Sequence, residues 1–596
     1  MTHAHRLAAV RRSMAEQGIH AFIVPHDDEH LGEYIPPYAA RLDWISGFTG
    51  SAGAAVVLAD KAAMFVDGRY TVQVRHQCDP SLFGYHHLID EPYLDWLLSE
   101  LDAGDTVGFD PRLHSQHWHQ NAKARLAEHN ITLVPLASNL IDEHWQDRPQ
   151  PDSHPALLLS QDYSGQHSEA KRSRIADTLA AQRIDAQLLT QAEPINWLLN
   201  IRGRDIDCLP VVLSFALLHR DGAVQLFADP AKFADLDLQA HCGQNVSLLP
   251  FNELASALQA LGNRQARVQL DPHTANAWSA LLLSEAGAEL VFAEDPCMLP
   301  KACKNPVEVN GSRAAHLRDG AAVSRFLAWL DRRLDEPNPE QEDEGTLADK
   351  LESLRAELPE FVEPSFSTIS ALGPNAAMCH YHHDNGTPRT LGQDAIYLVD
   401  SGGQYLDGTT DITRTVAVGE PDAEMRKLFT LVLRGHIDLA CARFPAGTGG
   451  QQLDALARMP LWQQGYNFDH GTGHGVGHYL SVHEGPQRIS PKGSMVALTT
   501  GMIVSNEPGY YREDGFGIRC ENLQVVQPAD LNGDIPVFEF ETLTFVPFDR
   551  RLIDSHWLEA RHITWLNQYH RQVWENISPQ LDGDDLAWLE QATRPI

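Results

Sequence analysis

Five side chains that commonly bind metal ions stand in order in the second half of the sequence. Four are carboxylates and one is an imidazole: Asp400, Asp411, His474, Glu507 and Glu521. Four carboxylates can offset the charge of two divalent cations. Their oxygens suit Mg or Mn, and the imidazole also admits Zn, Co or Fe. Because water bound to such ions ionises near neutral pH, this set of residues predicts metal-assisted hydrolysis.

The first two carboxylates flank a Gly-rich turn between two apolar segments. Asp400 ends the apolar strand expected at 395–399, and Asp411 begins the strand expected at 412–418. A hairpin of these strands would place both carboxylates at neighbouring strand ends, where they could hold a pair of metal ions.

The last two carboxylates also accompany apolar strands. Glu507 follows the strand expected at 503–506, and Glu521 is expected inside a fourth strand at 517–526. Taken singly, each acidic residue is better explained as a turn or cap residue. Taken together with His474, they favour a metal site, because acidic residues between apolar strands are costly to bury without a cation.

His474 lies in a Gly-rich segment, GTGHGVGHYLSVHEGP, whose glycines allow the backbone to approach a ligand closely. Val476 stands where a dinucleotide-binding GxGxxG motif needs its third Gly, and Gln487 stands where HExxH needs its second His. The segment HYHH at 380–383 is also rich in histidine. Adjacent histidines rarely converge on one ion, so we expect a loop with one useful side chain, His380.

Composition restricts the function further. The chain has 596 residues, enough for about four domains. Its net charge of −34 is spread along the length, which argues against nucleic acid and anionic membranes as partners. The N-terminus does not resemble a signal peptide, and no apolar run is long enough to span a membrane. The eight cysteines form no CxxC pair, as is typical of reduced thiols in the cytoplasm.

The first half of the sequence contains an internal repeat. The segment 183–189 echoes 18–24, and 195–203 matches 42–50, with Trp and the closing Gly at the same spacing. A Pro-rich stretch at 144–155 separates the two copies. The sequence therefore predicts two related α/β domains joined by a linker.

Helices are expected on either side of the strand-rich region. A long amphipathic helix is predicted at 304–334, and Thr346 is expected to cap a second helix after an acidic break. Strands predominate over 365–547, with one helix at about 422–443. The last 50 residues are rich in Trp and Tyr, and we expect helices there that pack on the catalytic region or on a second subunit.

The motifs resemble those of the pita-bread metallohydrolases, and more closely those of the three-domain, cytosolic type of aminopeptidase P (peptidase family M24). The similarity covers almost the whole chain and includes DGRY at 67–70, KNPVE at 304–308, DSGGQYLDGTTDITRT and HGTGHGVGHYLSVHEGP. It implies an α/β multidomain protein with two creatinase-like N-terminal domains, a pita-bread catalytic domain and a helical C-terminal extension. The expected boundaries are 1–150, 156–300, 304–545 and 546–596.

The resemblance implies two divalent metal ions, with Mn²⁺ favoured and Zn²⁺ or Co²⁺ as alternatives. Asp400 is expected to chelate one ion, Asp411 and Glu521 to bridge both, and His474 and Glu507 to hold the second. Glu507 is also expected to manage the proton of a metal-bridging hydroxide.

The resemblance also implies how substrate is held. His483 is expected to donate a hydrogen bond to the scissile carbonyl, and His380 is a further candidate for the catalytic machinery. His380 and His470 are expected to line the substrate cleft, and Arg519 to lie near a proline-binding pocket. Without the resemblance, each lone His would be a structural residue and Arg519 a salt-bridge partner.

These roles imply an enzyme that hydrolyses the bond between an N-terminal residue and a following proline. Its partners would be Xaa-Pro peptides, with neither nucleic acid nor membrane, and a cytoplasmic homodimer is expected. One alternative is a prolidase, which has the same ligands but cleaves only dipeptides. The other is a non-catalytic binding homologue, which the complete ligand set disfavours.

Overall fold

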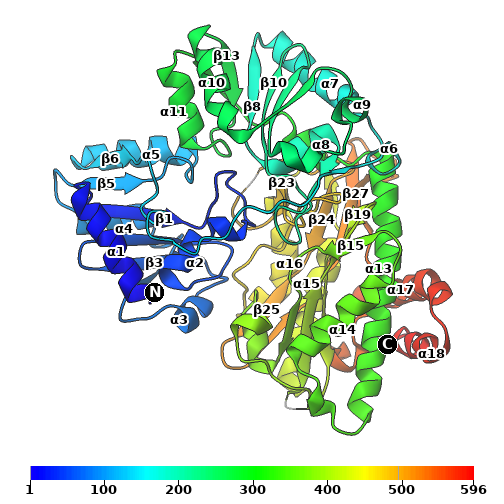
Figure 1. Ribbon diagram of the computed structural model, residues 1–596. Helices are drawn as coiled ribbons and strands as arrows, with labels where there is room; N and C mark the ends of the chain where they lie inside the picture. Colours follow the sequence, from blue (N-terminus) through cyan, green and yellow to red (C-terminus); the bar gives the residue numbers. More distant parts are fainter. Residues whose placement is uncertain (1, 393, 494) are drawn as a thin grey trace. The chain divides into compact units, whose positions relative to one another are not determined.

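The computed structural model describes every residue except 1, 393 and 494. The chain forms two compact units of mixed α/β structure (Figure 1). The first unit comprises Met1–Leu159 and Gln166–Cys297, and the second comprises Ser160–Gly165 and Met298–Ile596. No helix among the described residues combines the length and apolar character that crossing a membrane requires.

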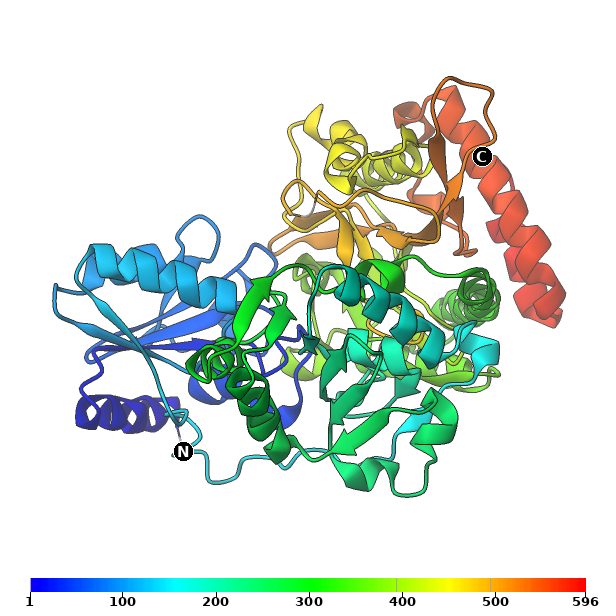
Figure 2. The same ribbon diagram turned by 90° about the horizontal axis from the view of Figure 1, so that it is seen from above.

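The first half of the first unit is a six-stranded mixed sheet in the order β4-β3-β2-β1-β5-β6. Its strands are β1 (Ala21–Pro25), β2 (Ala54–Leu58), β3 (Ala62–Val66), β4 (Gly84–His87), β5 (Thr106–Phe109) and β6 (Thr132–Pro135). Its helices are α1 (His3–Glu16), α2 (Arg41–Ser46), α3 (Gln73–Gln77), α4 (Tyr93–Glu100) and α5 (Gln116–Glu128). β1, β2 and β3 are buried along their whole length because α1 and α5 lie on opposite faces of the sheet (Figure 2).

The second half of the first unit repeats this topology. Its sheet has the order β12-β11-β10-β8-β13-β14. The strands are β8 (Ala186–Leu189), β10 (Phe215–His219), β11 (Val224–Phe227), β12 (Val246–Leu249), β13 (Arg267–Leu270) and β14 (Glu289–Phe292). The helices are α7 (Ser168–Ala181), α8 (Ala192–Leu199), α9 (Leu238–Cys242), α10 (Leu254–Asn263) and α11 (Ala277–Glu285).

Corresponding strand pairs have the same relative orientation, parallel or antiparallel, in the two sheets. β1 is antiparallel to β2 and parallel to β5, and β8 is likewise antiparallel to β10 and parallel to β13. The matched Trp44 and Trp197 lie in α2 and α8, at equivalent places in the two halves, and both are buried. This shared topology confirms the predicted duplication.

The described residues of the second unit form four sheets, in the orders β15-β18-β19, β16-β17-β20, β21-β28-β27-β24-β22-β23 and β25-β26. The strands of the first two are β15 (Phe361–Pro364), β16 (Ile369–Leu372), β17 (Ile396–Ser401), β18 (Gly403–Tyr405), β19 (Gly408–Thr409) and β20 (Ile412–Ala417). The others are β21 (Arg443–Pro445), β22 (Gly473–Gly475), β23 (Glu484–Ile489), β24 (Ile503–Asn506), β25 (Gly509–Arg512), β26 (Phe516–Arg519), β27 (Asn522–Pro528) and β28 (Val537–Thr542).

Helices of the second unit pack on these sheets. They are α12 (Met298–Ala302), α13 (Pro306–Asp335), α14 (Glu344–Ala356), α15 (Ala423–Ala440), α16 (Asp454–Trp462), α17 (Ala560–Ile577) and α18 (Gly583–Ala592). α13 and α15 confirm two predicted helices. α16 was not expected, because its nine residues include Pro460.

The predicted cap of α14 is wrong. The helix begins three residues earlier than predicted, at Glu344, and Asp343 is its N-cap. The Asp343 carboxylate accepts a hydrogen bond from the amide of Thr346, and the Thr346 hydroxyl accepts one from the amide of Asp343. Thr346 therefore belongs to the same capping box, but as its third helical residue.

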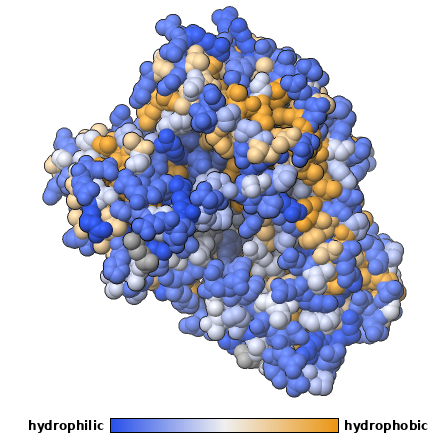
Figure 3. All heavy atoms as spheres, in the orientation of Figure 1, coloured by the Kyte–Doolittle hydropathy of each residue, from blue (hydrophilic) through white to orange (hydrophobic). Residues whose placement is uncertain are grey.

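The C-terminal helices α17 and α18, red in Figures 1 and 2, pack on their own chain. Tyr569 and Val573 of α17 share one apolar core with Leu428 and Leu433 of α15. This agrees with the first of the two packing partners predicted for the aromatic segment. On the face seen in Figure 3, hydrophilic residues predominate and apolar residues gather in patches, as the strong net charge leads one to expect.

Candidate metal centre

Two paired strands bring Asp400 and Asp411 together. Asp400 lies in β17 opposite Thr413 of the antiparallel strand β20, and Asp411 directly precedes β20. The chain between them forms β18 and β19 of another sheet. The predicted hairpin is therefore confirmed, and both carboxylates are buried, with 7% and 4% of their surface exposed.

His474 and Glu507 come from two neighbouring strands of the six-stranded sheet. His474 lies in β22, which pairs with β24, and Glu507 directly follows β24 as predicted. The amide of Glu507 donates to the carbonyl oxygen of Thr472 over 2.8 Å, so the two ligand-bearing segments are joined through their main chains.

Glu521 does not lie inside a strand, so that part of the prediction is wrong. β26 ends at Arg519 and β27 begins at Asn522, and the two strands belong to different sheets. The chain changes sheet at Glu521, whose amide donates to the carbonyl oxygen of Thr413 in β20 over 3.2 Å. This irregular position, rather than a continuous strand, directs the carboxylate toward Asp411.

The predicted ligands converge. Ligand atoms of Asp411, His474 and Glu521 all lie within 4.8 Å of one another. The His474 Nε2 atom is 3.5 Å from Asp411 Oδ2 and 3.4 Å from Glu507 Oε1. Five residues that are distant in the sequence thus form one cluster.

Hydrogen bonds orient two of these side chains. His474 Nδ1 lies 2.9 Å from the carbonyl oxygen of Gly475, which can only accept, so Nδ1 carries the proton. In the metal-free protein Nε2 shares a second proton with Asp411, and loss of that proton leaves its lone pair available to a metal ion. The hydroxyl of Ser505 donates to Glu507 Oε1 over 3.2 Å and accepts from the amide of His474 over 3.0 Å.

The electrostatics of the cluster are unfavourable without a cation. Burial, together with the charges of Asp411, Asp400 and Glu507, holds the pKa of Glu521 well above its usual range. Burial also raises the pKa of Glu507 to about 7, although the charge of His474 opposes the shift. Burial lowers the pKa of His474, but its hydrogen bond with Asp411 and the charge of Glu507 raise it to about 9.

Unpaired oxygen atoms test whether metal ions fit this cluster. Asp400 Oδ1 and Glu521 Oε1 are buried and have no hydrogen-bond partner among the described residues. A buried carboxylate oxygen without a partner carries a large desolvation cost, which a cation would remove. Since the donors are oxygens and one imidazole nitrogen, the residues fit divalent metal ions.

Arg519 connects the cluster to two further side chains. Its side chain is 2% exposed and forms an ion pair with Asp400. It donates to the hydroxyl of Tyr511 over 2.5 Å, and that hydroxyl donates to Nε2 of His470 over 2.8 Å. Two predicted substrate residues, His470 and Arg519, are thus joined through Tyr511, which the sequence analysis did not single out. The only signal in the sequence was the position of Tyr511 shortly after Glu507, in SNEPGYY.

The two remaining predicted residues are also near the cluster. The ring of His483 lies 4.4 Å from that of His474, at 77°. His380 is half-buried and follows Cys379, whose carbonyl oxygen accepts a hydrogen bond from Arg519 over 3.4 Å. The rest of the His-rich segment behaves differently: His382 and His383 stack on each other and pair with Asp384.

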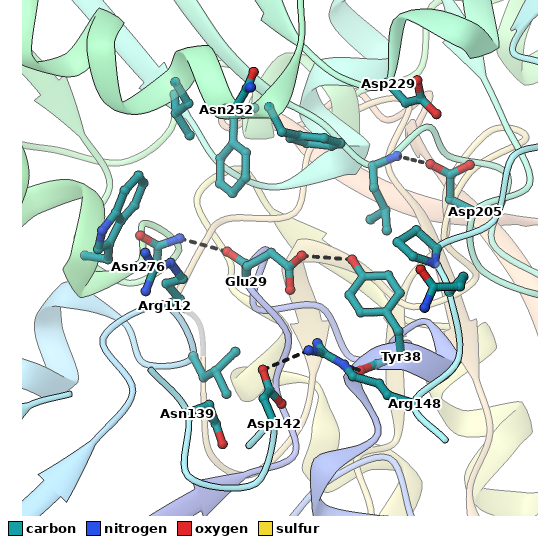
Figure 4. Close-up of a pocket in the computed structure, with 18 of the residues that line it drawn as sticks. Glu29, Tyr38, Arg112, Asn139, Asp142, Arg148, Asp205, Asp229, Asn252 and Asn276 are labelled. Carbon is teal, nitrogen blue, oxygen red and sulfur yellow. Dashed lines mark hydrogen bonds and ion pairs between the residues drawn. The ribbon is translucent and has the colours of Figure 1, made fainter. Parts of the chain in front are cut away.

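A separate cavity of about 1120 Å³ lies in the first unit (Figure 4). Its lining contains none of the five predicted ligands. Figure 4 shows Asp142 turned toward Arg148, and Glu29 toward Tyr38. Because its central carboxylates already have protein partners, this cavity is the weaker candidate for metal chemistry.

Four protein-family models match the chain, and together they cover both units. Residues 310–528 match metallopeptidase family M24, and residues 536–596 match the C-terminal region of peptidase M24. Residues 6–143 and 147–308 match two models of the creatinase/prolidase N-terminal domain. The protein is therefore a member of the M24 metallopeptidases with two creatinase-type domains, which confirms the predicted fold class.

Full-length relatives narrow the class further. The chain is 41% identical over 624 residues to a protein of Chaetomium globosum named "probable Xaa-Pro aminopeptidase P", with 99% of each chain covered. A protein of Tuber melanosporum with the same name is 39% identical, again with 99% of each covered. The chain belongs to the Xaa-Pro aminopeptidase P family, as its motifs predicted.

Solved structures support the same family assignment. The crystal structure of X-prolyl aminopeptidase from Caenorhabditis elegans, described as a cytosolic enzyme with a di-nuclear active site, is 35% identical, with a TM-score of 0.94 and all of both chains covered. The Xaa-Pro dipeptidase of Bacillus anthracis, 22% identical with a TM-score of 0.50, covers only 64% of this chain although 99% of its own is matched. The dipeptidase shares the fold over part of the chain only.

Proposed function

We propose that the protein is a dinuclear metal-dependent aminopeptidase that releases the N-terminal residue from peptides whose second residue is proline. The observation that carries the proposal is the cluster of four carboxylates and one imidazole in which Asp400 and Glu521 each keep a buried, unpartnered oxygen. Membership of the Xaa-Pro aminopeptidase P family supplies the specificity.

Asp400, Asp411, His474, Glu507 and Glu521 would hold the two ions, with Mn²⁺ as the favoured metal. When bound, such ions supply a Lewis-acidic centre that polarises a carbonyl group and promotes the ionisation of water. The protein's own contribution is to keep the donor atoms close together in a buried site before the ions arrive.

Glu507 is the proposed proton carrier. Its pKa is raised to about 7 by burial in the metal-free protein, and its Oε1 accepts from Ser505. With the ions bound, the Glu507 carboxylate would act as the base that takes a proton and then delivers it to the leaving proline nitrogen. The side chain is 18% exposed, so the group that exchanges the proton is accessible from the cleft.

His483 is the proposed hydrogen-bond donor to the scissile carbonyl oxygen. Its ring lies beside that of His474, so a carbonyl group held at the cluster would be within reach. A positioned donor of this kind contributes roughly 10²- to 10³-fold to turnover because it stabilises charge that develops only in the transition state.

Arg519, Tyr511 and His470 form the proposed support of the substrate cleft. Because Arg519 is buried and bound to Asp400, Thr413 and Tyr511, it orients Asp400, and its direct contact with proline stays a prediction. His470 and His380 remain the proposed substrate contacts. A homodimer and a cytoplasmic location are part of the same proposal.

The proposal is tested with Mn-loaded protein and three substrates: an Xaa-Pro dipeptide, an Xaa-Pro-Yaa tripeptide and a tripeptide without proline. Release of Xaa from the tripeptide with proline is expected. Cleavage limited to the dipeptide would support a prolidase, and cleavage regardless of proline a general aminopeptidase.

Glu507→Gln provides the matched control because it keeps the shape of the side chain and removes its charge. It is expected to abolish turnover in all assays. Absence of cleavage by the unmodified, metal-loaded protein would instead favour the non-catalytic alternative.

A further inference from the structure

A buried charge cluster lies directly beside His483 and is not used by the roles described above. Glu484 follows His483 in the chain and opens β23. It pairs with two lysines: Lys301 Nζ lies 2.7 Å from Glu484 Oε2, and Lys304 pairs with Glu484 Oε1. The side chains of Lys301, Lys304 and Glu484 are 3%, 1% and 1% exposed.

The cluster joins parts of the chain that are about 180 residues apart. Lys301 lies in the last turn of the short helix α12, and Lys304 stands just before α13. The amide of Lys304 also donates to the carbonyl oxygen of Gly501, shortly before β24, over 3.0 Å. Lys304 thus braces both the strand that begins at Glu484 and the segment that leads to Glu507.

The main chain around Glu484 is packed against the metal centre. Glu484 is paired with Gly475, the residue after His474. A Cβ atom on Gly475 would lie 2.3 Å from the carbonyl oxygen of Glu484, so only glycine allows this approach. The carbonyl oxygen of His483 accepts a hydrogen bond from Ser481 over 2.9 Å. The main chain on the C-terminal side of His483 is therefore fixed.

Burying charged groups this deeply costs stability, because apolar side chains of similar size would fill the same space without the desolvation penalty. The geometry that these groups fix is therefore the better explanation of their presence. Two lysines that hold one carboxylate through separate oxygens fix its position and rotation. Since Glu484 and His483 are adjacent in the chain, fixing one restricts the other.

We propose that Glu484, clamped by Lys301 and Lys304, is a positioning residue of the reaction that aims the His483 side chain at the substrate carbonyl. The inference rests on the proposed function, because it assumes the role given to His483. It assigns a function to Lys304, the lysine of the KNPVE motif.

Glu484→Gln tests the inference, because it preserves shape while it removes the charge that the lysines hold. We expect kcat to fall roughly 10- to 100-fold, the usual cost of a small misalignment, with KM changed less than threefold and two ions still bound. Lys301→Met removes one of the two cations and is a second variant in case Glu484→Gln does not fold. It should lower kcat in the same way but less.

A double-mutant cycle separates positioning from mere structural support. In a His483→Ala background, Glu484→Gln and Lys301→Met should each lower kcat less than twofold, because the group they aim is gone. Asp205→Asn is the matched control: it breaks the buried ion pair with Lys232 in the first unit. It should lower thermal stability and leave kcat unchanged.

The outcomes separate this inference from the proposed function. If His483→Ala keeps wild-type turnover, the role of His483 fails and the inference fails with it. If His483→Ala is slow but Glu484→Gln keeps wild-type kcat, or lowers kcat equally in both backgrounds, only the inference is overturned. The kcat of Lys301→Met is judged by the same criteria.

Discussion

Acidic side chains gather at two places in this molecule, and their partners differ. In the cavity of the first unit, Asp142 receives two hydrogen bonds from Arg41, over 2.8 and 2.9 Å, and one from Arg148 over 2.9 Å. In the second unit, the carboxylates of Asp411 and Glu521 form no ion pair with Lys or Arg among the residues that the structure describes, although Arg414 donates to the main-chain carbonyl oxygen of Glu521. Acidic composition alone therefore does not mark a metal site. Among the described residues of the second unit, Arg519 forms an ion pair with Asp400 only, so the carboxylates of Asp411 and Glu521 are left without a protein cation.

The physical reason is the cost of burying like charges. Guanidinium groups neutralise Asp142 from within the protein, so that site is complete. The cluster around Glu521 is buried more deeply, yet it leaves one oxygen of Asp400 and one of Glu521 unpaired among the described residues. Such a cluster is stable at neutral pH only if protons or metal ions supply the missing positive charge.

The sharpest test of the comparison removes one carboxylate from each place. Glu521→Gln is expected to lower kcat/KM by about 10³-fold or more and to reduce the bound metal, since one carboxylate ligand is lost. Asp142→Asn should leave turnover and metal content unchanged and cost about 1 kcal/mol of stability, because this ion pair is partly exposed. Kinetics, metal analysis and thermal unfolding measure the three quantities. Full metal occupancy in Glu521→Gln would contradict the comparison.

Metal removal should affect the two units differently. A ligand present at 100 times its Kd stabilises the state that binds it by about 2.7 kcal/mol. We expect chelation to lower hydrogen-exchange protection in β20 and β22, which adjoin the ligands, and to leave β1 and β8 of the first unit unchanged. Equal loss of protection in both units would show that the ions are not confined to the second.

The pH dependence of stability sharpens the same contrast. In the metal-free protein the pKa of Glu507 is raised from 4.5 to about 7 by burial, and that of His474 is raised from 6.5 to about 9 by Asp411 and Glu507 despite burial. Both groups bind protons more tightly when folded. Their stabilising contribution is full below pH 4.5 and 6.5 respectively, and it is lost as the pH rises through 7 and 9.

Metal-free protein should therefore lose stability between pH 5 and 9, by about 3 kcal/mol at most from Glu507 alone. Metal-loaded protein should keep its stability over this pH range, since the ions supply the positive charge that the protons supply in the metal-free protein. Thermal unfolding at a series of pH values, with and without chelator, measures this difference. Glu507→Gln is the control and should flatten the curve of the metal-free form. If the stability of the metal-free wild-type protein does not change with pH, the raised pKa values of Glu507 and His474 are contradicted.

The smallest effect concerns the hydroxyl that joins His470 to Arg519. Tyr511→Phe removes one hydrogen bond from each, and we expect a loss of about 1 kcal/mol in transition-state binding, or roughly fivefold in kcat/KM. Tyr510→Phe is the matched control, because its hydroxyl contacts Arg512 instead. If both variants behave alike, the link from the metal centre to the substrate cleft has no catalytic role.

The sequence alone was enough to predict the fold class and to single out five side chains that the fold brings together, because they lie in short motifs of distinctive composition; their role as metal ligands stays a prediction. The sequence also placed α13, from its apolar spacing, and α15, and two matched pairs of segments predicted the duplication in the first unit. The assignment of metal identity, the bridging hydroxide, the domain boundaries and the dimer stay predictions.

The tertiary structure decided what short motifs cannot encode. Glu521 looked like a strand residue because its neighbours are apolar, yet the chain changes sheets there. Tyr511 and Glu484 were not recognised, because their partners lie in other elements, and for Glu484 those partners are about 180 residues away in the chain. Local residue patterns reflect which face of an element is apolar, whereas the choice of charge partners depends on contacts that only folding creates.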